Sequence, residues 1–254
     1  MHPLLRGWVD VQRTHQANVR LGLTLCVVAG ATNAGGFLAV GQYTSHMTGV
    51  VSGIADHTVL GHWSLVAAGT AALLAFLLGA MTTAWLVNLG LRHRLHSAFG
   101  LPLLLEAAML LLFGLFGTAI SHYAALFTPL TVVLLCYTMG LQNAVVTKIS
   151  KADIRTTHLT GLVTDLGLEL GRLLYINRDP QHTPVRANRD RLRLQASLIG
   201  GFLLGALAGA WGFKVWGYVT TLPLAVLLLV VAWRPLAADL WTWHTTRGQN
   251  RYKP

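Results

Sequence analysis

The sequence predicts an all-α integral membrane protein with about six transmembrane helices and two short broken or re-entrant helices, built as an inverted-topology internal repeat. Three observations lead to this prediction. Hydrophobic residues make up 54% of the 254 residues and charged residues only 11%, whereas about 25% of an ordinary soluble domain is charged. Apolar runs of about 20 residues recur, which is the length that crosses a bilayer core. A polar phrase that contains a histidine occurs twice.

Six segments are apolar enough to cross a membrane. The predicted spans are 22–41, 65–89, 101–120, 128–147, 194–213 and 215–233. The third, LPLLLEAAMLLLFGLFGTAI, and the sixth, VWGYVTTLPLAVLLLVVAW, are the clearest. A helix on the surface of a soluble protein would carry a polar face, and these segments carry almost none. Residues 1–21 lack the apolar core of a signal peptide, so we expect a cytoplasmic N-terminal leader.

The repeated phrase belongs to a longer duplication. Residues 44–51, TSHMTGVV, return as TTHLTGLV at 156–163, and CVVAGATNA at 26–34 returns as CYTMGLQNA at 136–144. The two cysteines that open the second pair are 110 positions apart and the two histidines are 112 apart, so one two-residue insertion separates the copies. Matching patches in the same order indicate a duplicated unit. The predicted repeats are 22–120 and 128–233.

Positive charge gathers in the loops between the spans. The formal net charge is +10, and Arg92, Lys148 and Arg191 all lie between predicted spans, whereas 121–127 holds no basic residue except a histidine. Retention of lysine and arginine on the cytoplasmic side explains this distribution without a nucleic-acid partner. Placing the basic loops in the cytoplasm also places both termini there, including the basic tail 234–254.

Two segments, 44–62 and 156–175, remain without a crossing. Each offers about 12–16 helical residues, roughly 18–24 Å, which is short of a full span. One would lie on the outer side and the other on the inner side. Each repeat then has three crossings, and an odd number inverts the second copy relative to the first. If both segments crossed fully, the chain would instead have about eight spans and two parallel repeats.

The duplicated polar residues are the candidate solute-binding or pore-lining residues. They are Asn33, His46, Thr48, Gly49, Asn143, His158, Thr160, Gly161 and Asp165. Amides within a span are expected to face the bundle, where they either hold helices together or line a solute path. Thr48 and Thr160 resemble helix caps. Two helix starts from opposite faces would present N–H groups and positive dipole ends to a polar or anionic solute; the alternative is that these residues only cap and pack.

The few acidic residues are the candidates for coupling solute movement to an ion. Asp56, Glu106 and Glu169 fall within or near apolar segments, where an ionisable group is costly. Arg172 follows Glu169 by three positions, so an ion pair at a helix end is the alternative for that residue. Two histidines without cysteines or carboxylates at ligand spacing predict no metal site, and no cofactor is predicted.

Two stretches carry a family resemblance. AGATNAGGFLAVGQYTSHMTG at 29–49 and MGLQNAVVTKISKADIRTTHLTGLVTDLG at 139–167 resemble the signatures of the YoaK-like family of small bacterial membrane proteins. The resemblance covers 22–233 and implies a multi-pass protein of the bacterial inner (cytoplasmic) membrane. The family more often has an acidic residue where this chain has Asn33, so a proton or cation role is not carried over to that position. The resemblance implies no substrate and no reaction.

The predicted function is therefore a transporter or channel-like permease for a small polar or anionic solute. The sequence contains no G-x-S-x-G, H-E-x-x-H, P-loop or paired-cysteine motif, so we predict that the protein is not an enzyme. A non-transporting membrane scaffold or assembly protein is the alternative. A membrane-embedded enzyme that uses the two histidines and Asp165 is a third reading. The expected partners are membrane lipid and the small solute.

Overall fold

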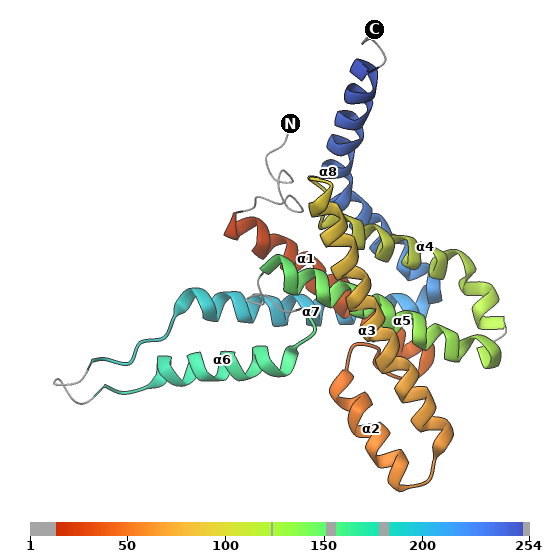
Figure 1. The fold of residues 1–254 in the computed structure, drawn as a ribbon. Helices are drawn as coiled ribbons and strands as arrows, with labels where there is room; N and C mark the ends of the chain where they lie inside the picture. The colour runs from red at the N-terminus through yellow and green to blue at the C-terminus, as the bar shows by residue number, and fades with distance from the viewer. Residues whose placement is uncertain (1–13, 123, 151–155, 178–182, 251–254) are drawn as a thin grey trace.

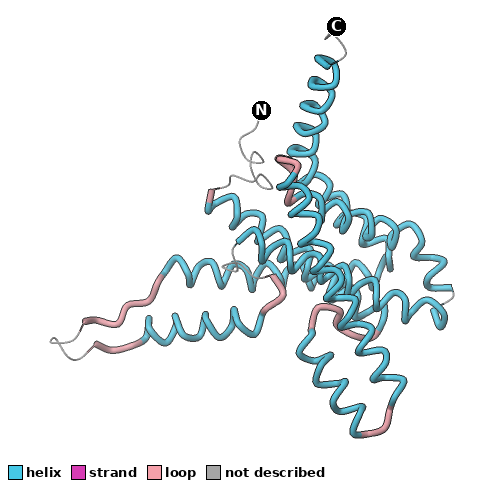
Figure 2. The backbone as a smooth tube through the Cα atoms, in the orientation of Figure 1, coloured by secondary structure: helices cyan, strands magenta, loops and turns pink. Residues whose placement is uncertain are grey.

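The computed structural model describes residues 14–122, 124–150, 156–177 and 183–250. All regular structure in these ranges is helical (Figures 1 and 2). The elements are α1 (His15–Val40), α2 (Met47–Val59), α3 (Trp63–Arg92), α4 (Gly100–His122), α5 (Ala124–Ser150), α6 (Leu159–Leu174), α7 (Arg189–Trp216), the 3₁₀ helix η1 (Gly217–Thr220) and α8 (Thr221–Asn250).

Five stretches of the described chain are long and apolar enough to cross a membrane. They are His15–Val40, Trp63–Arg92, Gly100–Gly117, Thr128–Ser150 and Arg189–Trp233. The fifth contains α7, η1 and the first part of α8, and the backbone breaks at Gly217, where φ is +58°. Since 45 residues of continuous helix would be roughly 68 Å long, about twice the bilayer core, this stretch cannot cross as one straight helix. The prediction of an all-α membrane protein is confirmed.

The outward faces of these helices suit a hydrocarbon environment. Only 17% of the most apolar stretch of α3 is buried within the protein. Leu74 and Trp85 on α3 and Leu204 on α7 are more than half exposed. Contiguous apolar surface of this extent is foreign to a soluble monomer. Lipid contact accounts for it.

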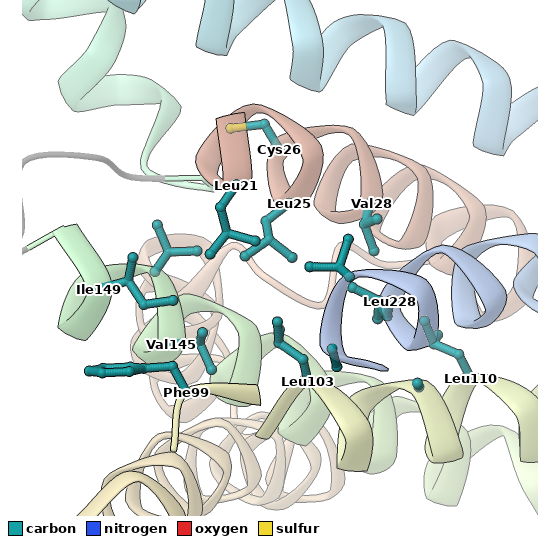
Figure 3. Close-up of a cluster of buried hydrophobic side chains, with 14 of the residues drawn as sticks. Leu21, Leu25, Cys26, Val28, Phe99, Leu103, Leu110, Val145, Ile149 and Leu228 are labelled. Carbon is teal, nitrogen blue, oxygen red and sulfur yellow. The ribbon is translucent and has the colours of Figure 1, made fainter. Parts of the chain in front are cut away.

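The main core lies between α1, α4, α5, α7 and α8. Leu21 and Leu25 on α1 meet Leu103 on α4 and Leu228 on α8, all fully buried (Figure 3). Their packing joins the two ends of the sequence into one body. The predicted loop 121–127 is wrong in extent, because α4 continues to His122 and α5 begins at Ala124.

Two pairs of helices approach each other through glycine. The helix α1 packs on α7, and α3 packs on α5. At four glycines a Cβ atom would lie 2.1 Å from a carbonyl oxygen of the partner helix: Gly30 against Phe202, Gly205 against Val27, Gly79 against Tyr137 and Gly140 against Phe76. Small residues let helix backbones come this close, which is how many transmembrane helices associate.

The two short segments form short helices, as predicted. The helix α2 has 13 residues and α6 has 16, so they are about 20 Å and 24 Å long. Each packs along the N-terminal part of the long helix that follows it, α2 on α3 and α6 on α7 (Figure 1). The predicted caps are wrong: the N-cap residues are His46 and His158, so Thr48 and Thr160 lie inside the first turn.

Candidate functional site

A cavity of about 870 Å³ lies where α2 and α6 begin. Residues of α1, α3, α5 and α7 complete its wall, among them Phe76, Gly140 and Phe202, which also belong to the close helix contacts. The polar part of the lining comes from both halves of the sequence: Asn33, Tyr43, Ser45, His46, Thr48, Asn143, Thr147, Lys148, Thr157, His158 and Thr160, with Gly161 beside them. The structure therefore brings most of the predicted site residues together.

The loop before α2 returns to α1 and is fastened there. Gly41 ends α1 with φ +77°, a conformation that glycine adopts without strain. The chain then folds back, and the Oδ1 atom of Asn33 accepts hydrogen bonds from the backbone N (3.2 Å) and the Oγ (2.9 Å) of Ser45. The amide thus holds the segment that leads into α2 against the C-terminal part of α1.

The loop before α6 is fastened to α5 in the same way. The Oδ1 atom of Asn143 accepts from the Oγ1 atoms of Thr157 (2.5 Å) and Thr156 (3.4 Å), and its Nδ2 atom donates to the carbonyl of Met139 (2.8 Å). Asn33 is 9% exposed and Asn143 is 7% exposed. Both predicted roles for these amides, as structural ties and as lining, are therefore compatible with their positions.

The two histidines occupy the positions immediately before the short helices. Neither ring makes a capping hydrogen bond to its own helix. The His46 ring instead lies over Gly49, where an added Cβ would be 2.3 Å from the ring Cδ2 atom. The glycine of the repeated phrase thus makes room for the imidazole at the cavity wall, which matches the alternative prediction that this glycine has a packing role.

The lining of the cavity is electropositive. Lys148, His46 and His158 line it together with the first turns of α2 and α6, and the described lining includes no carboxylate. The Nζ atom of Lys148 donates to the Oδ1 atom of Asn88 at 3.1 Å. Sequence reasoning treated Lys148 only as a marker of sidedness. Its spacing of four residues from Ala144 and eight from Gly140, which also line the cavity, was the signal that could have placed it on the same helix face.

Asp165 lies outside this cavity. It lines a second one of about 240 Å³ between α6 and α7, with Glu169, Arg172, Arg191 and Gln195. Glu169 is 4% exposed; its Oε1 atom accepts from Nη1 of Arg172 at 2.7 Å, and its Oε2 atom accepts from the backbone N of Asn188 at 2.8 Å. The alternative prediction for Glu169, an ion pair at the end of a helix, matches these contacts.

The other two acidic candidates lie apart from both cavities. Asp56 is exposed near the end of α2. Glu106 is fully buried in α4, and no described residue bonds either of its carboxyl oxygens. No group of three histidine, cysteine or carboxylate side chains comes together within the described part of the chain. Neither Asp56 nor Glu106 therefore adds negative charge to the central cavity, whose lining offers hydrogen-bond donors and the Lys148 ammonium group to a small ligand.

Comparison with known proteins gives the family. The family model described as "Protein of unknown function (DUF1275)" matches residues 21–233. The chain belongs to this DUF1275 family. It is also 31% identical over 157 residues to the UPF0700 transmembrane protein YoaK of Bacillus subtilis (strain 168), covering 59% of this chain and 67% of that protein. No solved structure matches it. The DUF1275 match confirms the resemblance noted from the two signatures.

Proposed function

We propose that this DUF1275 protein binds a small anion in the central cavity and passes it across the bacterial inner membrane, as a transporter or channel-like permease. One observation carries the proposal: the N-termini of α2 and α6 meet at one cavity whose described lining has a lysine and two histidines but no carboxylate. The first four N–H groups of a helix have no partner within that helix. The first turns of both helices line the same cavity, and the Met47 N–H donates to the Ser45 carbonyl at 3.2 Å, so the N–H groups that follow it are the ones offered to a ligand.

Anion binding follows from the physics of helix ends. Each N-terminus carries about half a positive charge, and its free N–H groups point along the helix axis toward a ligand. The hydroxyl groups of Thr48 and Thr160 lie in these first turns and can donate to the same ligand. In a membrane interior the low dielectric strengthens each of these attractions. Lys148 completes the charge balance for a monovalent anion.

The same proposal includes an inverted repeat with six crossings and both termini in the cytoplasm. Support comes from the glycine contacts, which form two equivalent sets: Gly30 with Phe202 and Gly205 with Val27, then Gly140 with Phe76 and Gly79 with Tyr137. Equivalent positions differ by 110 between α1 and α5 and by 126 between α3 and α7. The exchange of helix partners is what a two-fold axis between two repeats produces, and the odd number of crossings per repeat makes that axis one of inversion.

A measurement on reconstituted protein tests the function. Purified protein in proteoliposomes would be offered chloride, nitrate, formate and acetate, with urea and glycerol as neutral solutes, while influx is followed. We expect flux of at least one anion. Thr160→Val and Lys148→Gln should each lower it about tenfold to a hundredfold, because a hydrogen bond to a charged group contributes about 1.5–3 kcal/mol.

Thr164→Val is the matched control. Thr164 also lies on α6, but its hydroxyl donates to the carbonyl of Thr160 at 2.8 Å and does not line the cavity. That variant should keep wild-type flux. Flux of urea or glycerol without flux of any anion would contradict anion transport and would show that the protein passes a neutral polar solute. No flux of any probe by a stable protein would favour the scaffold alternative.

A further inference from the structure

The two cavities are neighbours. Gly161, in the first turn of α6, lines both of them. From there the smaller cavity follows one face of α6 through Asp165 and Leu168 to Arg172. The spacing of three or four residues keeps these positions on one side of a helix. The cavity thus runs from the central site along α6 toward the tip of the α6/α7 hairpin.

The helix α7 supplies the opposite wall in matching order. Leu198, Gln195 and Arg191 line the smaller cavity, and Phe202, one turn beyond Leu198, lines the central one. Arg191 lies at the start of α7, close to the basic loop that precedes it. Under the proposed topology this loop is cytoplasmic. The smaller cavity, here named the α6/α7 cleft, therefore extends under that topology from Gly161 at the wall of the central cavity toward the cytoplasmic side.

The corresponding contact between α2 and α3 is packed with apolar side chains. A Cβ at Gly69 of α3 would lie 2.8 Å from the Cγ1 atom of Ile54 and 4.0 Å from a methyl group of Val50. Met47 and Val50 also pack against Ala72 and its neighbours. Where α6 carries Asp165, Glu169 and Arg172, the repeat offset of 112 places Gly53, His57 and Leu60 on α2. Of these three positions on the α2 side, only His57 is polar, and none carries a carboxylate or a guanidinium group.

We propose that the α6/α7 cleft is the water-filled route between the central cavity and the cytoplasm, and that the α2/α3 contact closes the outer side in this conformation. The inference rests on the proposed function and topology. Asp165 and Glu169 balance Arg172 and Arg191 in formal charge, so the cleft is a passage for the solute and holds no net charge that would trap an anion on its way.

Cysteine modification tests the route without any knowledge of the solute. The Thr160→Cys variant places a thiol in the central cavity, and a small membrane-impermeant methanethiosulfonate reagent is applied to either face of oriented vesicles. The native Cys26 and Cys136 are buried and give the background. We expect modification at least tenfold faster from the cytoplasmic face. Gln195→Cys, in the cleft itself, is the second probe if the first variant folds poorly, and Ile54→Cys should react slowly from both faces.

A matched pair of leucines tests the path itself. Leu168 lines the cleft, whereas Leu170 lies on α6 outside it, and both side chains are exposed. Adding Leu168→Trp to Thr160→Cys should slow cytoplasmic modification at least fivefold, and Leu170→Trp should leave it unchanged. Equal rates from both faces, or equal effects of the two tryptophans, would overturn the inference. Asymmetric modification that no anion slows would support the route and contradict anion binding.

Discussion

At the scale of single residues, two asparagines determine where the short helices begin. Asn33 and Asn143 each use one amide oxygen to hold hydroxyl groups of the following loop. In a membrane interior an unpaired polar group costs several kcal/mol, so a loop at that depth must be tied to protein. The two amides meet this requirement and so keep the first turns of α2 and α6 at the cavity.

Replacing Asn143 by leucine should therefore loosen α6. The change leaves the Thr156 and Thr157 hydroxyl groups without their acceptor, which costs about 1–3 kcal/mol. We expect a lower thermal midpoint in detergent and faster hydrogen exchange across α6. The matched control is Thr70→Val, which removes a hydroxyl that bonds only the carbonyl of Val66 in its own helix. An Asn143→Leu protein as stable and protected as that control would contradict the role of the amide.

The sequence identified most site residues but not their contacts. The repeat singled out Asn33, Asn143 and the two histidines because duplication marks positions without reference to geometry. It could not show that Asp165 faces α7, since the assignment depends on which side of α6 packs against its neighbour. Lys148 was missed as a site residue because a basic residue at the end of a span is already expected from the positive charge of cytoplasmic loops. Only the structure shows that it also lines the cavity.

At the scale of helices, glycine determines which long helices pair. Gly140→Ala should destabilise the protein by about 1–3 kcal/mol or more, because the new methyl group would meet the carbonyl oxygen of Phe76 at 2.1 Å and the backbones must separate. Gly171→Ala on α6 is the control, with open space around it. Alanine favours helix over glycine by about 1 kcal/mol, so that variant should be neutral or slightly stabilised. Thermal unfolding of both variants measures the difference, and equal destabilisation would exclude close backbone packing as the cause.

A polar contact outside the membrane fastens α8 to the connection between α3 and α4. Asp239 accepts hydrogen bonds from the backbone N atoms of His96 and Ser97, both at 2.9 Å, and from the Ser97 Oγ at 2.6 Å. The His96 Nδ1 atom lies 2.9 Å from the same carboxylate. Burial raises the pKa of the Asp239 carboxyl, but these hydrogen bonds outweigh burial and hold the pKa below the ordinary value of 3.8.

This contact should make stability depend on pH in the acid range. A carboxyl whose folded pKa is depressed stabilises the protein fully above its ordinary value, and the contribution is lost as the pH falls through the folded pKa. Asp239→Asn should therefore lower the thermal midpoint at pH 7, and the difference from wild type should shrink below about pH 4. Asp56→Asn, at an exposed position, should match wild type at both pH values. A deficit that stays constant down to pH 2 would show that the charge is unimportant.

At the scale of the whole molecule, the proposed topology puts the α3/α4 connection and the tip of the α6/α7 hairpin on the same side. Single cysteines at Arg94 and Asn177 should react with an impermeant maleimide from the cytoplasmic face, and cysteines at Gln42 and His62 from the outer face. Six crossings with inverted repeats require this pattern. Reaction of the Arg94 and Asn177 positions from opposite faces would support eight crossings and parallel repeats instead.

The sequence predicted the membrane class, the short helices and their lengths, because length and hydropathy are local properties. It could not predict that α1 packs on α7 and α3 on α5. That choice depends on small residues that meet across helices far apart in the chain. Nothing in the sequence around Gly30 or Gly205 indicates which helix each glycine will pack against. The boundary near 121–127 was misplaced for a similar reason, since loop composition alone does not say where a helix stops.

The glycine contacts have a mechanical consequence. They hold α1 against α7 and α5 against α3, so each close pair joins one helix from each half of the sequence. The short helices α6 and α2 pack on α7 and α3 and so belong to the same groups. A relative motion that kept these contacts would therefore separate the group α1, α6 and α7 from the group α2, α3 and α5, and would not separate the two halves of the sequence. The chain passes from one of these two groups to the other between α1 and α2, and again between α5 and α6. Ser45 and Thr157, which line the cavity, lie in these two connections. A solute bound in the cavity would therefore contact both of the chain segments that link the two groups.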